Sequence, residues 1–93
     1  GSGVGWYSSI IYNHKVKKGM AEAIEIGVGS SSEKLKDKLI SDLGLDENIN
    51  IPAIMRGDEV IMAHGDTQIH EDDHLIVFYK NKGDIDSFYE KFR

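Results

Sequence analysis

The sequence predicts a single α+β domain in which helices pack on a mainly antiparallel β-sheet. Stretches with the alternating apolar and polar residues of half-buried strands lie between stretches with the apolar spacing of amphipathic helices. Short turns join the strands of the second half, and such turns suit antiparallel pairs but not a parallel crossover. Together these observations predict the order helix, strand, helix, three strands, helix, and 93 residues are enough for one such core.

The first 14 residues are expected to be a tag remnant followed by a linking helix, before one domain at 15–93. The glycines of residues 1–5 have GxGxG spacing and no strand before them, unlike a phosphate-binding glycine loop. Trp6, Tyr7 and the isoleucines after them have helical spacing and predict a short amphipathic helix over 6–14. Its apolar face has two candidate partners, the core of this domain or a second chain.

A strand and a helix are expected next along the chain. Residues 21–28 carry isoleucine or valine at every second position from Ile24, which predicts a half-buried strand. Ser30 and Glu33 have the spacing of a helix capping box, and leucines follow at helical spacing. We therefore expect a helix over 32–43, ended by a left-handed Gly44.

A β-hairpin is expected in the middle of the chain. Residues 49–55 alternate like a strand, although Pro52 has no N–H to donate and so predicts a free edge or a bulge. The Arg-Gly-Asp-Glu sequence at 56–59 predicts a tight turn, and residues 60–63 predict the returning strand.

The last third predicts two turns, a central strand and a closing helix. The turns are expected at 64–67 and 70–73, where glycine and aspartate gather. The continuous apolar run at 75–79 predicts a strand covered on both faces. Asp84 is the expected N-cap of a helix whose apolar residues over 85–92 recur at i, i+3, i+4 and i+7.

Composition excludes several classes of function. The chain has no cysteine, so it has no disulfide, thiolate metal site or thiol nucleophile. Its net charge of −5 disfavours nucleic-acid binding, which needs clustered lysine and arginine. No run approaches the roughly 20 apolar residues of a membrane-spanning helix. We therefore expect the domain to lie in water, with any link to a membrane made by a partner.

Neither catalysis nor metal binding is expected. The serines include no strand–turn–helix nucleophile elbow, so we predict no catalytic residue and no enzyme activity. His70 and His74 flank an acidic turn, but a zinc site needs three or four preset ligands, and a polar turn between strands explains the same residues. We predict no metal site.

Several separated motifs resemble the C-terminal domain of TrkA-type potassium-transport regulatory subunits. The family's junction is similar to VKKGMAEAIE at 16–25, its central hairpin to IMRGDEVIM at 54–62, and its closing turn and strand to residues 65–78. The ending FYEKF at 88–92 resembles its terminal helix. The motifs occur in the family's order, and the resemblance covers residues 15–93.

The resemblance implies a non-catalytic regulatory domain, also called the RCK C-terminal domain. Such domains usually follow a nucleotide-binding Rossmann domain, dimerise, and belong to cytosolic rings that gate potassium channels and transporters. The implied partners are a second copy and a membrane channel or transporter subunit that holds the domain at the inner face of the membrane. The nucleotide site of the longer subunit would lie outside this chain, so no cofactor is expected in this fragment.

The resemblance does not carry over one known ligand site. Some members bind cyclic di-adenosine monophosphate between two domains through an Asp-x-Arg sequence followed by an asparagine. The nearest sequence here is Asp46-Glu47-Asn48, which lacks the arginine.

Two other functions remain open at this point. The chain is alternatively a stand-alone sensing domain that binds a nucleotide or metabolite in a cleft between the sheet and a partner chain, with Asn50, Arg56 and His64 as polar contacts. It is otherwise a pure assembly domain. The free edge expected at Pro52 invites pairing with a second copy through Ile49, Ile51 and Ala53, unless the proline simply blunts that edge.

Overall fold

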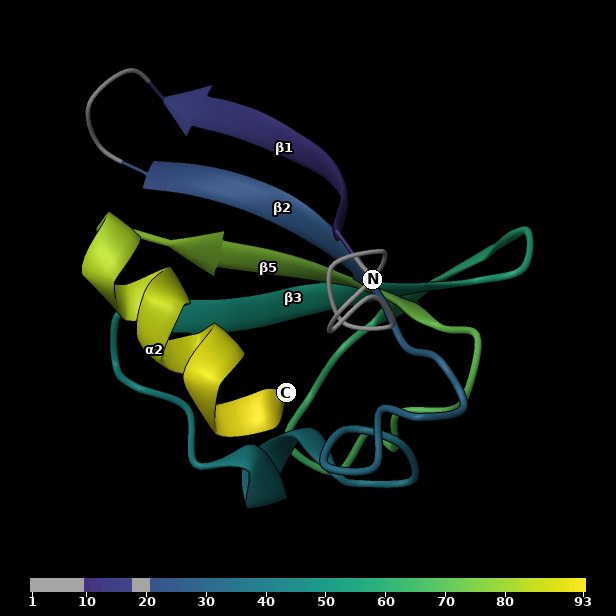
Figure 1. Ribbon diagram of the computed structural model, residues 1–93. Helices are drawn as coiled ribbons and strands as arrows, with labels where there is room; N and C mark the ends of the chain where they lie inside the picture. The colour runs from purple at the N-terminus through teal and green to yellow at the C-terminus, as the bar shows by residue number, and fades with distance from the viewer. Residues whose placement is uncertain (1–9, 18–20) are drawn as a thin grey trace.

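The computed structural model describes residues 10–17 and 21–93, with side chains from residue 22 onward. Within these residues, an antiparallel sheet of five strands in the order β1-β2-β5-β3-β4 is followed by one α-helix (Figure 1). The elements are β1 (Ile10–Lys17), β2 (Ala21–Gly27), the 3₁₀ helix η1 (Ile40–Leu43), β3 (Ile49–Arg56), β4 (Glu59–Met62), β5 (His74–Tyr79) and α2 (Lys82–Phe92). The predicted α+β class is therefore confirmed.

The central position of the last strand is also confirmed. β5 pairs with β2 on one side and with β3 on the other, antiparallel to both. Its burial alternates, because Leu75, Val77 and Tyr79 are buried while Ile76 and Phe78 are half-buried. The prediction that this strand is covered on both faces was wrong: the apolar run fills the core with one face and leaves the other partly open.

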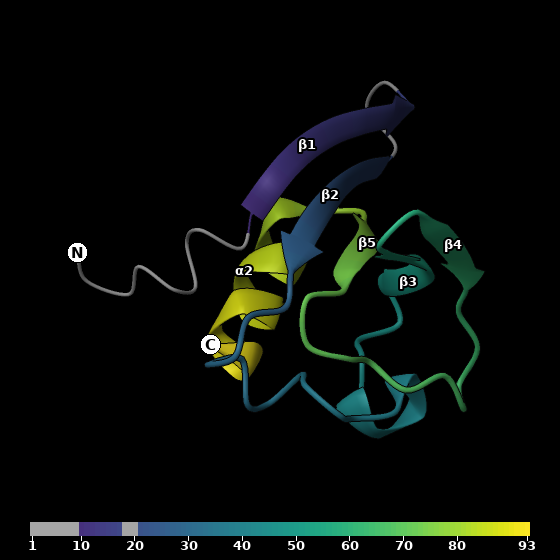
Figure 2. The same ribbon diagram turned by 90° about the vertical axis from the view of Figure 1, so that its right-hand side faces the viewer.

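The helix α2 covers that buried face (Figure 2). Its predicted apolar stripe is confirmed, since Ile85, Phe88 and Phe92 join the core cluster. The helix begins earlier than expected, with Asn81 at the N-cap, so Asp84 lies in the first turn. There its carboxylate accepts the backbone N–H of Asn81 at 3.2 Å, which satisfies a donor that has no partner inside the helix.

The predicted N-terminal helix was wrong over residues 10–14. These residues begin β1, which pairs antiparallel with β2 and places His14 opposite Ala23. A short run of isoleucine and tyrosine fits both periodicities, and the hairpin partner decides between them by accepting and donating backbone hydrogen bonds. Residues 6–9 lie outside the described part of the chain. β1 crosses the expected boundary at 14/15 and belongs to the sheet.

The predicted helix over 32–43 was also wrong, because only Ile40–Leu43 is helical. Asp37 has a left-handed φ of 65°, which interrupts any α-helix. The N–H of Asp37 donates to the carbonyl of Ile69 at 2.7 Å, and the N–H of Ile69 donates to the carbonyl of Lys38 at 2.8 Å. The backbone of this segment therefore bonds to a distant loop in place of its own preceding turn.

The local signals of that segment had mixed outcomes. Ser32 is buried, and its Oγ accepts the N–H of Gly29 at 3.1 Å. This serine therefore stabilises a turn and does not cap the start of an α-helix. Gly44 does end a helix with a left-handed φ of 60°, as predicted, but the helix is the single turn of η1.

The irregularity expected at Pro52 is confirmed. The register between β3 and β5 shifts between Asn50 and Ala53. The carbonyl of Pro52 accepts the N–H of Ala63 at 3.0 Å, while β4 pairs with β3 only from Ala53 onward. In the described part of the chain, residues 49–51 therefore have a strand partner on the β5 side alone.

The turn of the β3–β4 hairpin gives a direct test of the backbone geometry. Gly57 has a φ of 61°, and a Cβ there would meet no atom within 4 Å. Gly57→Ala should therefore lose about 1–2 kcal/mol of unfolding free energy from backbone strain alone. The matched change Gly83→Ala, in α2 and also in open space, should lose nothing or gain less than about 1 kcal/mol. Urea unfolding measures both, and equal losses would contradict the hairpin geometry.

Candidate functional site

The buried charged side chain of the described region lies where two central strands meet. Asp73 is 1% exposed and directly precedes β5. Arg56 is the last residue of β3. Because Met55 of β3 pairs with His74 of β5, the next pair of positions brings Arg56 beside Asp73. The antiparallel register thus creates this contact between residues that are far apart in the sequence.

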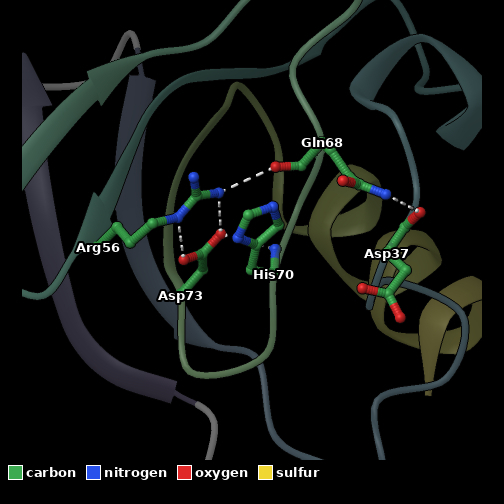
Figure 3. A network of polar contacts seen from close by, with 5 residues as sticks. All are labelled: Asp37, Arg56, Gln68, His70 and Asp73. Atoms are coloured by element: carbon green, nitrogen blue, oxygen red, sulfur yellow. Dashed lines mark hydrogen bonds and ion pairs between the residues drawn. The ribbon is translucent and has the colours of Figure 1, made fainter.

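The contact is a two-pronged ion pair, shown in Figure 3. Nε of Arg56 donates to Oδ1 of Asp73 at 2.8 Å, and Nη2 donates to Oδ2 at 2.8 Å. The backbone N–H of His70 adds a third hydrogen bond to Oδ2 at 2.7 Å. A buried carboxylate is tolerated only when it is paired and hydrogen-bonded in this way.

The same pair ties two connecting segments to the sheet: the loop between β4 and β5, and the segment between β2 and η1. Nη2 of Arg56 also donates to the carbonyl of Gln68 at 3.0 Å, and Nε2 of Gln68 donates to the carbonyl of Asp37 at 3.1 Å (Figure 3). The backbone carbonyl of Asp73 accepts the N–H of Val28, just after β2, at 2.8 Å. We call the five residues drawn in Figure 3 the Arg56–Asp73 junction; they are Asp37, Arg56, Gln68, His70 and Asp73.

Electrostatics keep both members of the pair charged. Burial by itself raises the pKa of Asp73, but the hydrogen bonds from Arg56 and from the backbone of His70, with the charge of Arg56, bring that pKa below its ordinary value. The hydrogen bond to Asp73 in turn raises the pKa of Arg56. A general acid or base needs a pKa near the working pH, so this pair suits a structural role.

The three predicted ligand contacts have different surroundings in the structure. Arg56 is held by Asp73 and Gln68, so a ligand would have to break that junction to reach it. Asn50 is exposed on the opposite face of β3, where it pairs with Phe78. His64 is exposed just beyond β4, and its N–H donates to Thr67. Ligand binding by Asn50, Arg56 and His64 stays a prediction.

The predicted interface residues are divided between the two faces of the sheet. Ile49 and Ile51 are 7% and 2% exposed and belong to the core of this chain, whereas Ala53 is half-buried on the other face. A second copy pairing at this edge would therefore meet the backbone of the first two residues and not their side chains. Pairing of two copies here stays a prediction.

The two histidines weighed as metal ligands make separate contacts. His74 Nδ1 lies 2.7 Å from Oε2 of Glu25 on β2. His70 contributes its backbone to the Arg56–Asp73 junction. Within residues 10–17 and 21–93, no three histidine, aspartate or glutamate side chains gather closely enough to hold a metal ion. No described helix has the length and apolar character that crossing a membrane requires.

An apolar sheet face was missed by reading the strands separately. The register places Met62, Ala53 and Ile76 in one row across β4, β3 and β5, on the side away from α2. Val60 and Met62 are 55% and 66% exposed. We call this surface the open sheet face; its apolar members are Ala53, Met55, Val60, Met62, Ile76 and Phe78. The irregularity at Pro52 hides it, because it reverses the apolar alternation midway along β3.

Comparison with known proteins decides the family. The model of the TrkA-C domain matches residues 24–93. This chain belongs to the TrkA-C domain family. The resemblance of the separated motifs is thereby confirmed.

Relatives and a solved structure agree with the TrkA-C assignment. The chain is 35% identical over 88 residues to the "Trk system potassium uptake protein TrkA" of Vibrio alginolyticus, covering 89% of this chain and 19% of the relative. It is 39% identical over 75 residues to the protein of that name from Halomonas elongata, covering 78% and 16%. The chain thus spans less than a fifth of these relatives.

A solved structure described as "Structure of RCK domain with cda" shares the fold. It is 27% identical in sequence, and the two structures match with a TM-score of 0.60. The match covers 76% of this chain and 97% of that one. The TrkA-C fold is therefore that of an RCK domain.

The Arg56–Asp73 junction is tested by removing one partner. Arg56→Met leaves the Asp73 carboxylate buried without its cation and should cost roughly 3 kcal/mol of unfolding free energy. Lys82→Met removes an exposed, solvent-screened ion pair with Asp86 and should cost far less than Arg56→Met. Urea unfolding at neutral pH measures both. The double change Arg56→Met with Asp73→Leu should recover much of the loss, and a failure to recover any would argue against an unpaired charge as its cause.

The lowered pKa of Asp73 also predicts a dependence of stability on pH. Because the folded pKa lies below the unfolded value of about 3.9, the ionised carboxylate contributes its full stabilisation above that value. This contribution is lost as the pH falls through the folded pKa. Below about pH 4 the unfolding free energy should therefore fall less steeply for Asp73→Asn than for the native chain. Urea unfolding of both proteins at several acidic pH values measures this. If the unfolding free energy changed equally with pH in both, the prediction would be refuted.

Proposed function

We propose that this chain is a non-catalytic regulatory domain of a potassium uptake system. Membership of the TrkA-C family carries this proposal, since the relatives are Trk system potassium uptake proteins. In the proposed role the domain dimerises and passes a ligand-biased change of geometry to a membrane subunit. It would work in the cytoplasm, held by that subunit at the inner face of the membrane. The greater length of the relatives supports a longer native chain that also carries a nucleotide-binding Rossmann domain.

The surroundings of the Arg56–Asp73 ion pair and of Tyr89 support a mechanical role and not a catalytic one. The ion pair at the Arg56–Asp73 junction is committed to holding strands and loops together. Burial raises the pKa of Tyr89 to about 12, so its hydroxyl stays protonated at physiological pH. Neither arrangement supplies a proton carrier tuned to neutral pH.

The open sheet face supports dimerisation. Met62 and Val60 lie exposed beside the half-buried Ile76 and Met55, and covering such a surface removes apolar area from water. A second copy of the chain is the proposed cover. In this proposal the dimer contact is made by the open sheet face and not by the side chains of Ile49 and Ile51, which pack in the core.

A ligand would act by preferring one arrangement of this assembly. It shifts the equilibrium only by its difference in affinity for the two states. The similar RCK domain is described "with cda", which supports ligand binding here as well. Asn50 and His64 are the proposed contacts, because they flank the hydrogen bond between Pro52 and Ala63 where β3 loses its second partner.

The dimer is tested by placing a charge on the open sheet face. Met62→Glu should weaken self-association at least about tenfold, because a carboxylate would be buried in an apolar contact. Ser31→Glu adds the same charge at an exposed turn away from the sheet and should leave association unchanged. Sedimentation equilibrium measures both. A native chain that is monomeric at all accessible concentrations would end the dimer proposal.

The role in transport is tested in the full-length subunit. Cells that depend on it for potassium uptake should lose growth at limiting potassium when it carries Met62→Glu, and keep growth with Ser31→Glu. The rate of potassium uptake is measured directly in the same cells. Unchanged uptake after deletion of the whole domain would refute a regulatory role, whatever the oligomeric state.

A further inference from the structure

A cavity lies on the other side of the molecule from the open sheet face. It is a half-open pocket with a volume of about 250 Å³, lined by α2 and by the segment that joins η1 to β3. Its floor is apolar, formed by Ile49, Phe88 and Phe92, which are 7%, 2% and 5% exposed. This size approaches the lower end of small-molecule pockets, roughly 300 Å³. Neither the Arg56–Asp73 junction nor the open sheet face shares a residue with it.

The rim of the cavity is rich in hydrogen-bond acceptors. Asp46 stands on the loop wall, and Asp84 and Ser87 stand on the helix wall. Only one oxygen of each carboxylate has a partner: Asp46 Oδ1 accepts the N–H of Asn48 at 2.9 Å, and Asp84 Oδ2 is bonded to Asn81. Within the described residues, the second oxygen of each carboxylate is available to a ligand.

The one lysine of the lining is already committed. Nζ of Lys91 donates to the carbonyl of Gly44 at 2.7 Å and lies 5.4 Å from the centre of the Phe92 ring. These contacts hold the end of η1 against α2 and draw the ammonium toward that carbonyl. The groups at the rim without such a contact are two carboxylates and a hydroxyl, and two carboxylates against one ammonium leave the lining net negative.

We propose that this cavity binds a small organic cation, namely a primary amine that carries an apolar group. The ammonium would lie between Asp46 and Asp84, where charge-assisted hydrogen bonds are strongest. The hydrocarbon part would rest on Phe88 and Ile49. An inorganic cation fits less well, because it needs six or more oxygen ligands and gains nothing from an apolar floor.

Such a ligand would join the loop to the helix. Asp46 precedes β3 by three residues, and Asp84 lies in the first turn of α2. Occupancy would therefore stabilise the docking of α2 beside the start of β3. The inference does not rest on the role in potassium uptake, since binding is measured on the 93-residue chain alone.

The test is an NMR titration of the ¹⁵N-labelled chain with phenethylammonium chloride. We expect saturable shifts confined to residues 44–49 and 84–92. The neutral 2-phenylethanol should bind at least about tenfold more weakly, and sodium phenylacetate should not bind, because the rim is acidic. Equal binding of the three compounds would overturn the preference for a cation. Scattered or linear shifts would overturn the site itself.

Two variants locate the bound amine. Ser87→Trp places a large side chain in the cavity from an exposed helix position and should abolish binding, whereas Asp86→Asn, outside the lining, should not change it. Asp46→Asn keeps an acceptor for Asn48 but removes one charge, and should weaken binding about fivefold or more. The amide spectrum of each variant reports its fold. Unchanged affinity in Ser87→Trp or in Asp46→Asn would refute the proposed location.

Discussion

The buried carboxylate of Asp73 constrains more of this structure than any other single group. A charge taken out of water costs several kcal/mol unless it is paired, so Arg56 must reach it from the neighbouring strand. That requirement holds the end of β3 to the beginning of β5. The same guanidinium and carboxylate then bind the loop at Gln68 and His70, and through Gln68 the left-handed turn at Asp37.

The commitment of these polar groups to structure shapes what the domain offers to partners. Its interior is apolar or fully hydrogen-bonded, and no buried side-chain polar atom of the described region lacks a partner. Recognition is left to the surface. One side presents the open sheet face with Met62 at its edge, and the other presents the cavity under α2. The two surfaces lie on opposite sides of one sheet, so a second copy and a small ligand would not compete for the same groups.

From the sequence, Arg56 and Asp73 could be recognised only as turn residues. Arg56 was assigned to the start of a hairpin turn and Asp73 to the end of another, and both turns are present. Their pairing depends on the register of β3 against β5, which no local pattern reveals. The open sheet face was hidden for a related reason. The shift at Pro52 puts Ile51 in the core and Ala53 on the open face, although the two stand at alternating positions.

Local periodicity and turn chemistry alone determined the α+β class, the β3–β4 hairpin, the central strand and the closing helix. The hairpin turn and the helix N-cap join residues a few positions apart, so the local pattern contains them. The partners of β5 are distant in sequence, but its continuous apolar run already marks a strand that needs a neighbour on each side. Only the tertiary structure decided residues 10–14 and 32–43. Their apolar spacing suits a helix, but their backbone groups find stronger partners elsewhere: β2 for the first, and the loop around Ile69 for the second. A segment's hydrogen bonds must all be satisfied, and partners distant in sequence are invisible until the chain has folded.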